Sequence, residues 1–353
     1  MKVKERKSNF ELLRIITMLM IVTMHVLDYS GIFLSENILS YNFIVSNIIN
    51  GFSIVAVNCY ILITGYFGYK QEFKKNKLVK LYTQVIVISI FTSLIFWIFK
   101  LENININNLV KTFMPIISQS WWFISVYFVL YIITPYINKL IEVLNKNELE
   151  KMILIGLIIF VIWPSISAGD LINPISEDGG YGLYNFILLY IIGAYIGKYK
   201  DTIKVSKYNF FFIYVISMTL LVCINLGLTY LMNKYIAKLS YDFILTYIGS
   251  ISLFVFFKEL NFKSTIINFV SSLTLGVYLI HEHPFVRNLI AKVMNESKIY
   301  LDNSFILYLV LIVVGVYCVT SILEFIRIKI FKLVLEYKNK IIDKGNCSEM
   351  NGG

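Results

Sequence analysis

Charged residues are scarce in this sequence. They make up only 15% of its 353 residues, whereas hydrophobic residues make up 58%. Soluble proteins average about 25% charged and about 45–50% apolar residues, so the surplus here needs an apolar solvent rather than a larger core. We therefore expect a lipid bilayer to surround much of the protein. The same composition excludes a disordered chain, a collagen-like chain and a disulfide scaffold.

Cysteine and histidine are also few, with four and three residues. The cysteines include no CxxC pair, so we interpret them as apolar side chains rather than a redox or metal device. His281 and His283 are two positions apart and do not share a helical face, and the string His281-Glu282-His283 is not the HExxH motif of a zinc protease. We expect no metal; a three-histidine zinc site that includes His25 is the alternative.

Long apolar runs, by contrast, are numerous. An α-helix needs about 17–25 mostly apolar residues to cross a bilayer. The first run lacks a signal-peptide cleavage site, so we expect it to remain as a helix. Ten candidate spans, several of them short, lie near residues 12–30, 41–66, 79–99, 116–138, 152–168, 183–197, 208–230, 242–257, 264–282 and 304–326. The sequence therefore predicts an all-α fold, a polytopic membrane helix bundle of about ten transmembrane helices. It comprises a single membrane domain, residues 1–335, and a short cytoplasmic tail, residues 336–353.

Positive charge is distributed unevenly among the connections between these spans. With the N-terminus placed inside, the inner segments hold 24 of the 32 lysines and arginines and the outer segments hold 7. Lysine and arginine concentrate on the cytoplasmic side of membrane proteins, so this bias predicts an even number of spans with both termini cytoplasmic. The formal net charge of +10 then reflects orientation, and we expect the lipid bilayer rather than nucleic acid as a partner.

The first span carries several polar side chains. Ser8 and Glu11 have the spacing of a capping box, which predicts that the helix begins just after Ser8. Arg14 and His25 are eleven residues apart, about three turns and about 16 Å, so they share one face. Asp28 follows one turn later, close enough to orient or charge the imidazole of His25. Such a polar column must point into the bundle.

Ionisable side chains inside a membrane are costly and are usually functional. Two structural interpretations remain open: Arg14 extends to the lipid headgroups and only sets orientation, and His25 only hydrogen-bonds a neighbouring helix. At the outer helix ends, Trp121 and Trp122 are expected either to contact an acceptor or to form an interfacial aromatic belt. His281 and Glu282, at the outer end of the ninth span, are likewise expected either to line an outer cavity or to anchor the interface.

At these residues the sequence resembles a known family. The segment 9–16 (NFELLRII), followed by His25, is similar to the signature of the acyltransferase-3 family of multi-pass bacterial membrane acyltransferases, in which an arginine, ten residues and a histidine lie in the first span. Thr64 stands where that family often has a serine. Weaker matches lie at residues 63–67, 121–123, 131–135 and 276–281, and the resemblance covers roughly residues 8–330. It implies transfer of an acyl group, usually acetyl from acetyl-CoA, to a sugar hydroxyl of a cell-surface or lipid-linked glycan at the bacterial cytoplasmic membrane.

A mechanism follows as a hypothesis. His25 takes the proton of the acceptor hydroxyl as general base, or forms an acyl-histidine, and Asp28 holds its tautomer. The glycan approaches from outside, near the tryptophans and the acidic loop 165–182. Residues expected to bind the phosphates of cytoplasmic acyl-CoA are Arg14, Lys70, Lys74 and Lys75. The lysines also have a simpler explanation as topology signals.

Two other classes of protein are also multi-spanning and are alternatives to an acyltransferase. A transporter or flippase of a lipid-linked saccharide would use Arg14, His25 and Asp28 as pathway residues, although prolines that would mark broken helices are few. A polysaccharide polymerase or ligase is also multi-spanning, but it would be expected to carry large outer loops with clustered arginine, which this sequence lacks.

Overall fold

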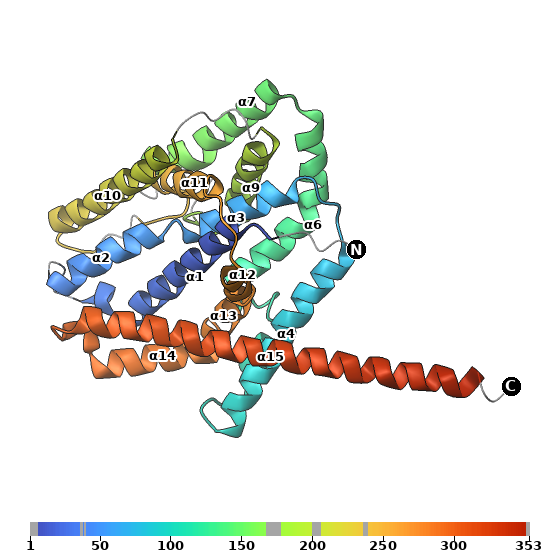
Figure 1. Cartoon of the computed structure of the whole chain (residues 1–353). Helices are drawn as coiled ribbons and strands as arrows, with labels where there is room; N and C mark the ends of the chain where they lie inside the picture. Colours follow the sequence, from blue (N-terminus) through green and yellow to red (C-terminus); the bar gives the residue numbers. More distant parts are fainter. Residues whose placement is uncertain are drawn as a thin grey trace.

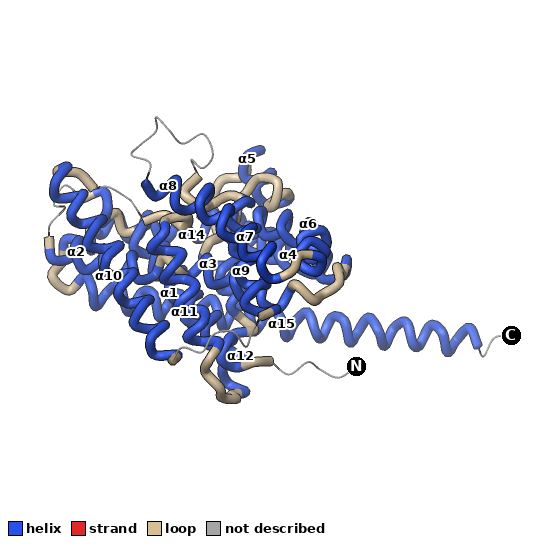
Figure 2. Tube along the Cα trace, turned by 90° about the horizontal axis from the view of Figure 1, so that it is seen from above, coloured by secondary structure: helices blue, strands red, loops and turns tan. Residues whose placement is uncertain are grey.

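The computed structural model describes residues 6–35, 38, 40–166, 178–199, 206–235 and 239–350. Within these ranges every regular element is a helix, as Figure 2 shows. The α-helices are α1 Ser8–Tyr29, α2 Tyr41–Ser53, α3 Ala56–Gly68, α4 Lys75–Ile98, α5 Ile106–Phe113, α6 Trp122–Val143, α7 Lys146–Leu157, α8 Trp163–Ile166, α9 Leu183–Lys198, α10 Lys207–Met232, α11 Ile244–Lys258, α12 Thr265–Ser271, α13 Thr274–His281, α14 Pro284–Ser297 and α15 Phe305–Met350.

Seven helical segments of the described residues are long and apolar enough to cross a membrane. The prediction of an all-α membrane helix bundle is therefore confirmed. Three shorter apolar helices, Leu183–Lys198, Ile244–Lys258 and Thr265–His281, coincide with the other three candidate spans. The count of ten, the cytoplasmic termini and the boundary of the membrane domain stay predictions. The helix α15 continues through the expected tail to Met350 and extends beyond the bundle (Figure 1).

The first helix lies inside the bundle, packed against α2, α3 and α11 to α15. Apolar side chains lie on all sides of this helix; Leu13, Val22 and Leu27 have no exposed surface, and Leu12, Ile15 and Ile16 are half-buried. A helix that is apolar all round belongs in the interior. With the exception of Asp28, which is exposed, the polar side chains of α1 therefore meet neighbouring helices or a cavity.

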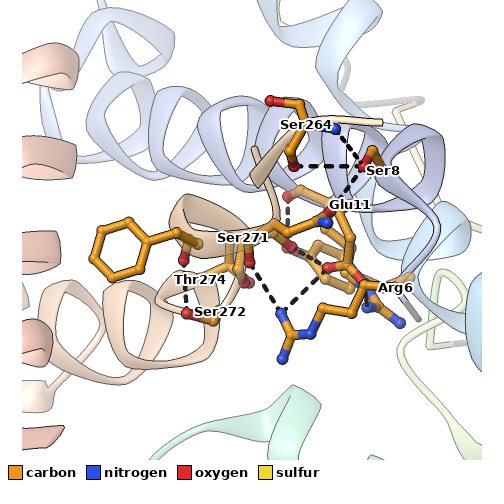
Figure 3. Close-up of polar contacts among 11 residues, drawn as sticks. Arg6, Ser8, Glu11, Ser264, Ser271, Ser272 and Thr274 are labelled. Atoms are coloured by element: carbon orange, nitrogen blue, oxygen red, sulfur yellow. Dashed lines mark hydrogen bonds and ion pairs between the residues drawn. The ribbon is translucent and has the colours of Figure 1, made fainter. Parts of the chain in front are cut away.

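The predicted capping box at the start of α1 is wrong. Lys7 is the N-cap residue and no side chain caps the helix. Ser8 instead donates to Oδ1 of Asn268 at 3.0 Å and accepts from the backbone N–H of Ser264 at 2.9 Å. Ser8 and Glu11 both point toward the α12 segment (Figure 3). Partners on another helix have displaced the local pairing that the sequence pattern favoured.

Helices α3 and α9 pack without space for a side chain between them. A Cβ atom on Gly65 would lie 2.0 Å from the backbone oxygen of Tyr190, and one on Gly193 would lie 2.3 Å from that of Leu62. Small residues let membrane helices approach this closely, which increases their van der Waals contact. The α3–α9 pair therefore forms a tightly joined wall.

Two helical segments are interrupted within the bundle. Residues 54–55 separate α2 from α3, and residues 272–273 separate α12 from α13. The sequence did not clearly mark broken helices, because neither interruption contains proline. In a membrane, irregular backbone is tolerated where it is buried in protein or lines a cavity. Ser271, Ser272 and Thr274 at the second interruption do line one.

Helix α14 was not expected as a separate element. His283 caps its N-terminus, because Nδ1 of His283 accepts from the backbone N–H of Phe285 at 3.2 Å. Pro284 at the first helical position needs no hydrogen-bond acceptor and already has a helical φ. Helix α14 packs against α1 and α13, beside the site described below.

Candidate active site

A cavity of about 470 Å³ runs along one face of α1. Glu11, Arg14, Met18, Ile21 and His25 line it at alternating spacings of three and four residues, which is the spacing of a single helical face. The prediction that Arg14 and His25 point the same way agrees with this geometry. The two side chains face a common space within the bundle.

The other walls of the cavity come from α3, α4, α6, α9, α12 and α13. The end beside Arg14 is lined by Arg6, Gln71 and Lys77. The end beside His25 is lined by Trp122, Tyr241 and Tyr278. With the predicted orientation, the first end faces the cytoplasm and the second faces the outside.

His25 belongs to a buried polar cluster at the far end of this cavity. Its Nδ1 lies 3.0 Å from Nε2 of His281 and 3.2 Å from Oε1 of Glu282. Tyr29 donates its hydroxyl hydrogen to the same carboxylate oxygen. Nη1 of Arg287 lies 3.7 Å from Oε2 of Glu282. The carboxylate is thus held from both sides while it faces the imidazole of His25.

The hydrogen bonds of this cluster select a tautomer for His25. Nδ1 of His281 lies 2.6 Å from the backbone oxygen of Val277, which can only accept, so this nitrogen carries the hydrogen. A neutral His281 then offers Nε2 as an acceptor. His25 donates from Nδ1 toward this acceptor and toward Glu282, which leaves its Nε2 unprotonated. An unprotonated ring nitrogen on a cavity wall is what a general base requires.

The three groups around His25 also resemble a set of metal ligands. Ligand atoms of His25, His281 and Glu282 lie within 4.8 Å of one another, and two imidazoles with one carboxylate are a common zinc set. The same atoms also contact one another without an ion, because Nδ1 of His25 faces both Nε2 of His281 and Oε1 of Glu282. The expectation of no metal stays a prediction.

Arg14 is held by a neighbour on its own helix. Its Nη1 donates to Oε1 of Glu11 at 2.9 Å, and its side chain remains 32% exposed. Lys70, Lys74 and Lys75 are exposed and do not line the cavity. The basic segment reaches the cavity through Lys77 and its neighbours instead. Lys77 is also exposed, and sequence reasoning could not tell which lysine of the segment borders the cavity.

The two tryptophans occupy different environments. Trp121 is buried, packs edge-on against His283 with ring centroids 5.6 Å apart, and does not line the cavity. Trp122 does line it, with the rings of Tyr181 and Tyr241 centred 4.5 Å and 5.9 Å away. Burial raises the pKa of Tyr241 above the usual range, so its hydroxyl remains a donor at neutral pH. Residues 167–177 of the acidic loop lie outside the described residues.

Comparison with known proteins decides the class of reaction. The family model described as an acyltransferase domain matches residues 7–325, which is most of the chain. The chain belongs to the acyltransferase-3 family. No match was found among the curated proteins or the solved structures. The protein is therefore a multi-pass membrane acyltransferase that transfers groups other than aminoacyl groups.

In this acyltransferase the residues that contact His25 are not the ones expected from the sequence. Asp28 was expected to orient the imidazole, yet its side chain is exposed and Nδ1 of His25 meets His281 and Glu282 instead. Those two residues were expected at the outer cavity or the interface, but they are buried behind His25. The sequence did hold one indication of this contact. His281 and Glu282 lie at the outer end of the ninth predicted span, at a depth in the membrane similar to that of His25.

Proposed function

We propose that this acyltransferase is an O-acetyltransferase of the bacterial cytoplasmic membrane. It moves the acetyl group of cytoplasmic acetyl-CoA to a hydroxyl of a cell-surface or lipid-linked glycan. The observation that carries the proposal is the single cavity that has Arg14 toward one end and His25 toward the other. A donor and an acceptor that approach from opposite sides of the membrane can meet in such a cavity.

The donor end suits a phosphorylated thiol ester. Arg14 presents a planar guanidinium that can bind two phosphate oxygens at once. Arg6 and Lys77 line the same end and add positive charge. The acyl group then extends along α1, past Met18 and Ile21, toward His25. The side chains of Met18 and Ile21 are apolar, which suits an uncharged acyl-bearing arm.

The chemical step is a transfer from sulfur to oxygen. Nε2 of His25 takes the proton of the acceptor hydroxyl while that oxygen attacks the thioester carbonyl carbon. The carbon–sulfur bond breaks, and the departing CoA thiolate takes the proton from the imidazolium. Glu282, 3.2 Å from Nδ1, stabilises the imidazolium that forms between the two events. Attack by His25 itself, with an acyl-histidine intermediate, uses the same cavity.

The acceptor end offers aromatic surface and hydroxyl donors. Trp122 and Tyr241 line the cavity beside His25, and Tyr181, which is 47% exposed, connects them to the outer surface. Flat apolar faces with polar edges suit a ring that bears several hydroxyls. These residues support a sugar as the acceptor.

A transporter of a lipid-linked saccharide is the second candidate. The interruptions between α2 and α3 and between α12 and α13 favour it, because transporters often place binding sites at broken helices. A transporter would move the saccharide without consuming acetyl-CoA. The two candidates therefore make opposite predictions for a labelled donor.

The experiment supplies membranes that contain the protein with acetyl-CoA labelled in the acetyl group. Wild type is expected to place label in glycan, and His25→Ala and His25→Gln are expected to lower the rate about 10²–10⁴-fold, the usual contribution of a general base. His283→Asn, a histidine substitution outside the cavity, serves as the control. Full acetylation by His25→Ala would overturn the role of His25. Absence of label with every acyl-CoA, with an altered distribution of lipid-linked saccharide, would favour transport.

A further inference from the structure

Glu11 is a buried carboxylate at the donor end of the cavity. Only 6% of its surface is exposed. Oε1 of Glu11 accepts from Nη1 of Arg14 at 2.9 Å. Oε2 accepts from the hydroxyl of Ser271 at 2.5 Å and lies 3.8 Å from Nη1 of Arg6. Figure 3 shows Glu11 reaching from α1 toward the end of α12, with Arg6 beside it.

The two oxygens of Glu11 therefore have separate partners. One holds the guanidinium of Arg14, and the other is anchored at Ser271, where α12 ends before the interruption that lines the cavity. An arginine side chain is long and has many rotamers, so a fixed partner on one nitrogen restricts the whole group. A guanidinium has five N–H donors, and the bond to Glu11 leaves others for a ligand.

We propose that Glu11 is a positioning residue that fixes the guanidinium of Arg14 for the phosphates of the donor. The inference rests on the proposed use of acyl-CoA. Glu11 acts through Arg14 and not by contact with the donor. Its anchoring at Ser271 couples the orientation of Arg14 to the packing of α1 against α12.

A competing effect has the opposite sign. The negative charge of Glu11 repels phosphate, so its removal alone would strengthen donor binding. Two observations favour orientation as the larger effect. Arg6 and Arg14 together exceed the single charge of Glu11, so the cluster stays cationic with Glu11 in place. Both carboxylate oxygens of Glu11 are also already engaged, one by Arg14 and the other by Ser271 and Arg6.

The test measures binding by titration calorimetry of an acetyl-CoA analogue in which a ketone replaces the thioester. Glu11→Gln keeps the shape and removes the charge, and we expect its Kd to rise about tenfold, as for loss of a single charge-assisted hydrogen bond. We expect KM for acetyl-CoA to rise by a similar factor, with little change in kcat. Glu259→Gln removes the same charge from an exposed residue after α11 and is expected to bind like wild type.

A double variant separates positioning from a general structural effect. In an Arg14→Ala background, Glu11→Gln should cause no further loss of binding, because its effect passes through Arg14. Additive losses would overturn the proposal, as would tighter or unchanged binding by Glu11→Gln alone. A wild-type protein that does not bind the analogue would overturn the acyl-CoA assignment itself, together with this inference. Failure of the acyl-CoA assignment and failure of the positioning role of Glu11 therefore give different results.

Discussion

Nδ1 of His25 lies 3.0 Å from Nε2 of His281, although 256 residues separate them in the chain. The contact joins the end of α1 to the end of α13. His281 is fixed in turn by its bond to the backbone oxygen of Val277. The backbone oxygen of Val277 thus fixes the hydrogen of His281 on Nδ1. The free Nε2 of His281 in turn fixes the hydrogen of His25 on its own Nδ1.

This series of hydrogen bonds from Val277 through His281 to His25 predicts the effect of changing His281. His281→Ala removes the acceptor that orients His25, so we expect kcat to fall at least about tenfold, a fraction of the general-base contribution. KM for acetyl-CoA should change little, because His281 does not line the cavity. Steady-state kinetics with labelled acetyl-CoA measures both. Wild-type kcat in this variant, with the protein shown to be folded by its thermal midpoint, would contradict the role of this series of hydrogen bonds.

The lysines of the segment after α3 should differ in their effect on the donor. Both Lys74 and Lys77 are exposed, but only Lys77 lines the cavity. We expect Lys77→Ala to raise KM for acetyl-CoA about threefold to tenfold at low salt, and less at high salt because screening weakens the interaction. Lys74→Ala is the matched control and should leave KM unchanged. Equal effects of the two substitutions would mean that the charge of the segment acts only at long range.

The N-cap of α14 predicts a pH dependence of stability. Burial, with a smaller effect from the charge of Arg287, lowers the pKa of His283 from 6.5 to about 4. The unfolded chain therefore takes up a proton at a higher pH than the folded one, and stability is lost as the pH falls from about 6.5 toward about 4. At pH 5 the loss is about 2 kcal/mol. Protonation would also remove the acceptor for Phe285 N–H.

The variant His283→Asn tests this prediction, because asparagine is a good N-cap that does not titrate. Its thermal midpoint in detergent should fall less between pH 7 and pH 5 than that of wild type. The other two histidines are present in both proteins, so the difference isolates His283. Parallel decreases in the two proteins would assign the pH dependence to other groups.

Removal of metal should not affect transfer. The proposed proton transfer by His25 needs no Lewis acid, and the ligand atoms around it already contact one another or Tyr29. We expect dialysis against EDTA to leave the rate unchanged. Loss of activity that zinc restores would show that His25, His281 and Glu282 form a metal site instead.

The sequence was sufficient for features that depend on local periodicity. Hydropathy predicted helices at the ten places where the described residues form apolar helices, and the spacing of Arg14 and His25 put them on one face. Features that depend on contacts between distant helices were not accessible. The partners of His25 come from α13, and those of Ser8 come from α12. A local pattern such as the capping box fails where such partners compete for the same side chain.

The close contact of α3 and α9 limits how the cavity can open. Both helices contribute to its lining, and even a methyl group at Gly65 or Gly193 would collide with the backbone of the other helix. The two helices must therefore move together if they move at all. In the proposed reaction, any opening of the cavity for donor exchange or acceptor release would then come from the opposite side, formed by α4, α6 and the α12–α13 segment. We therefore expect substitutions in those helices, rather than in α3 or α9, to change the rate of exchange.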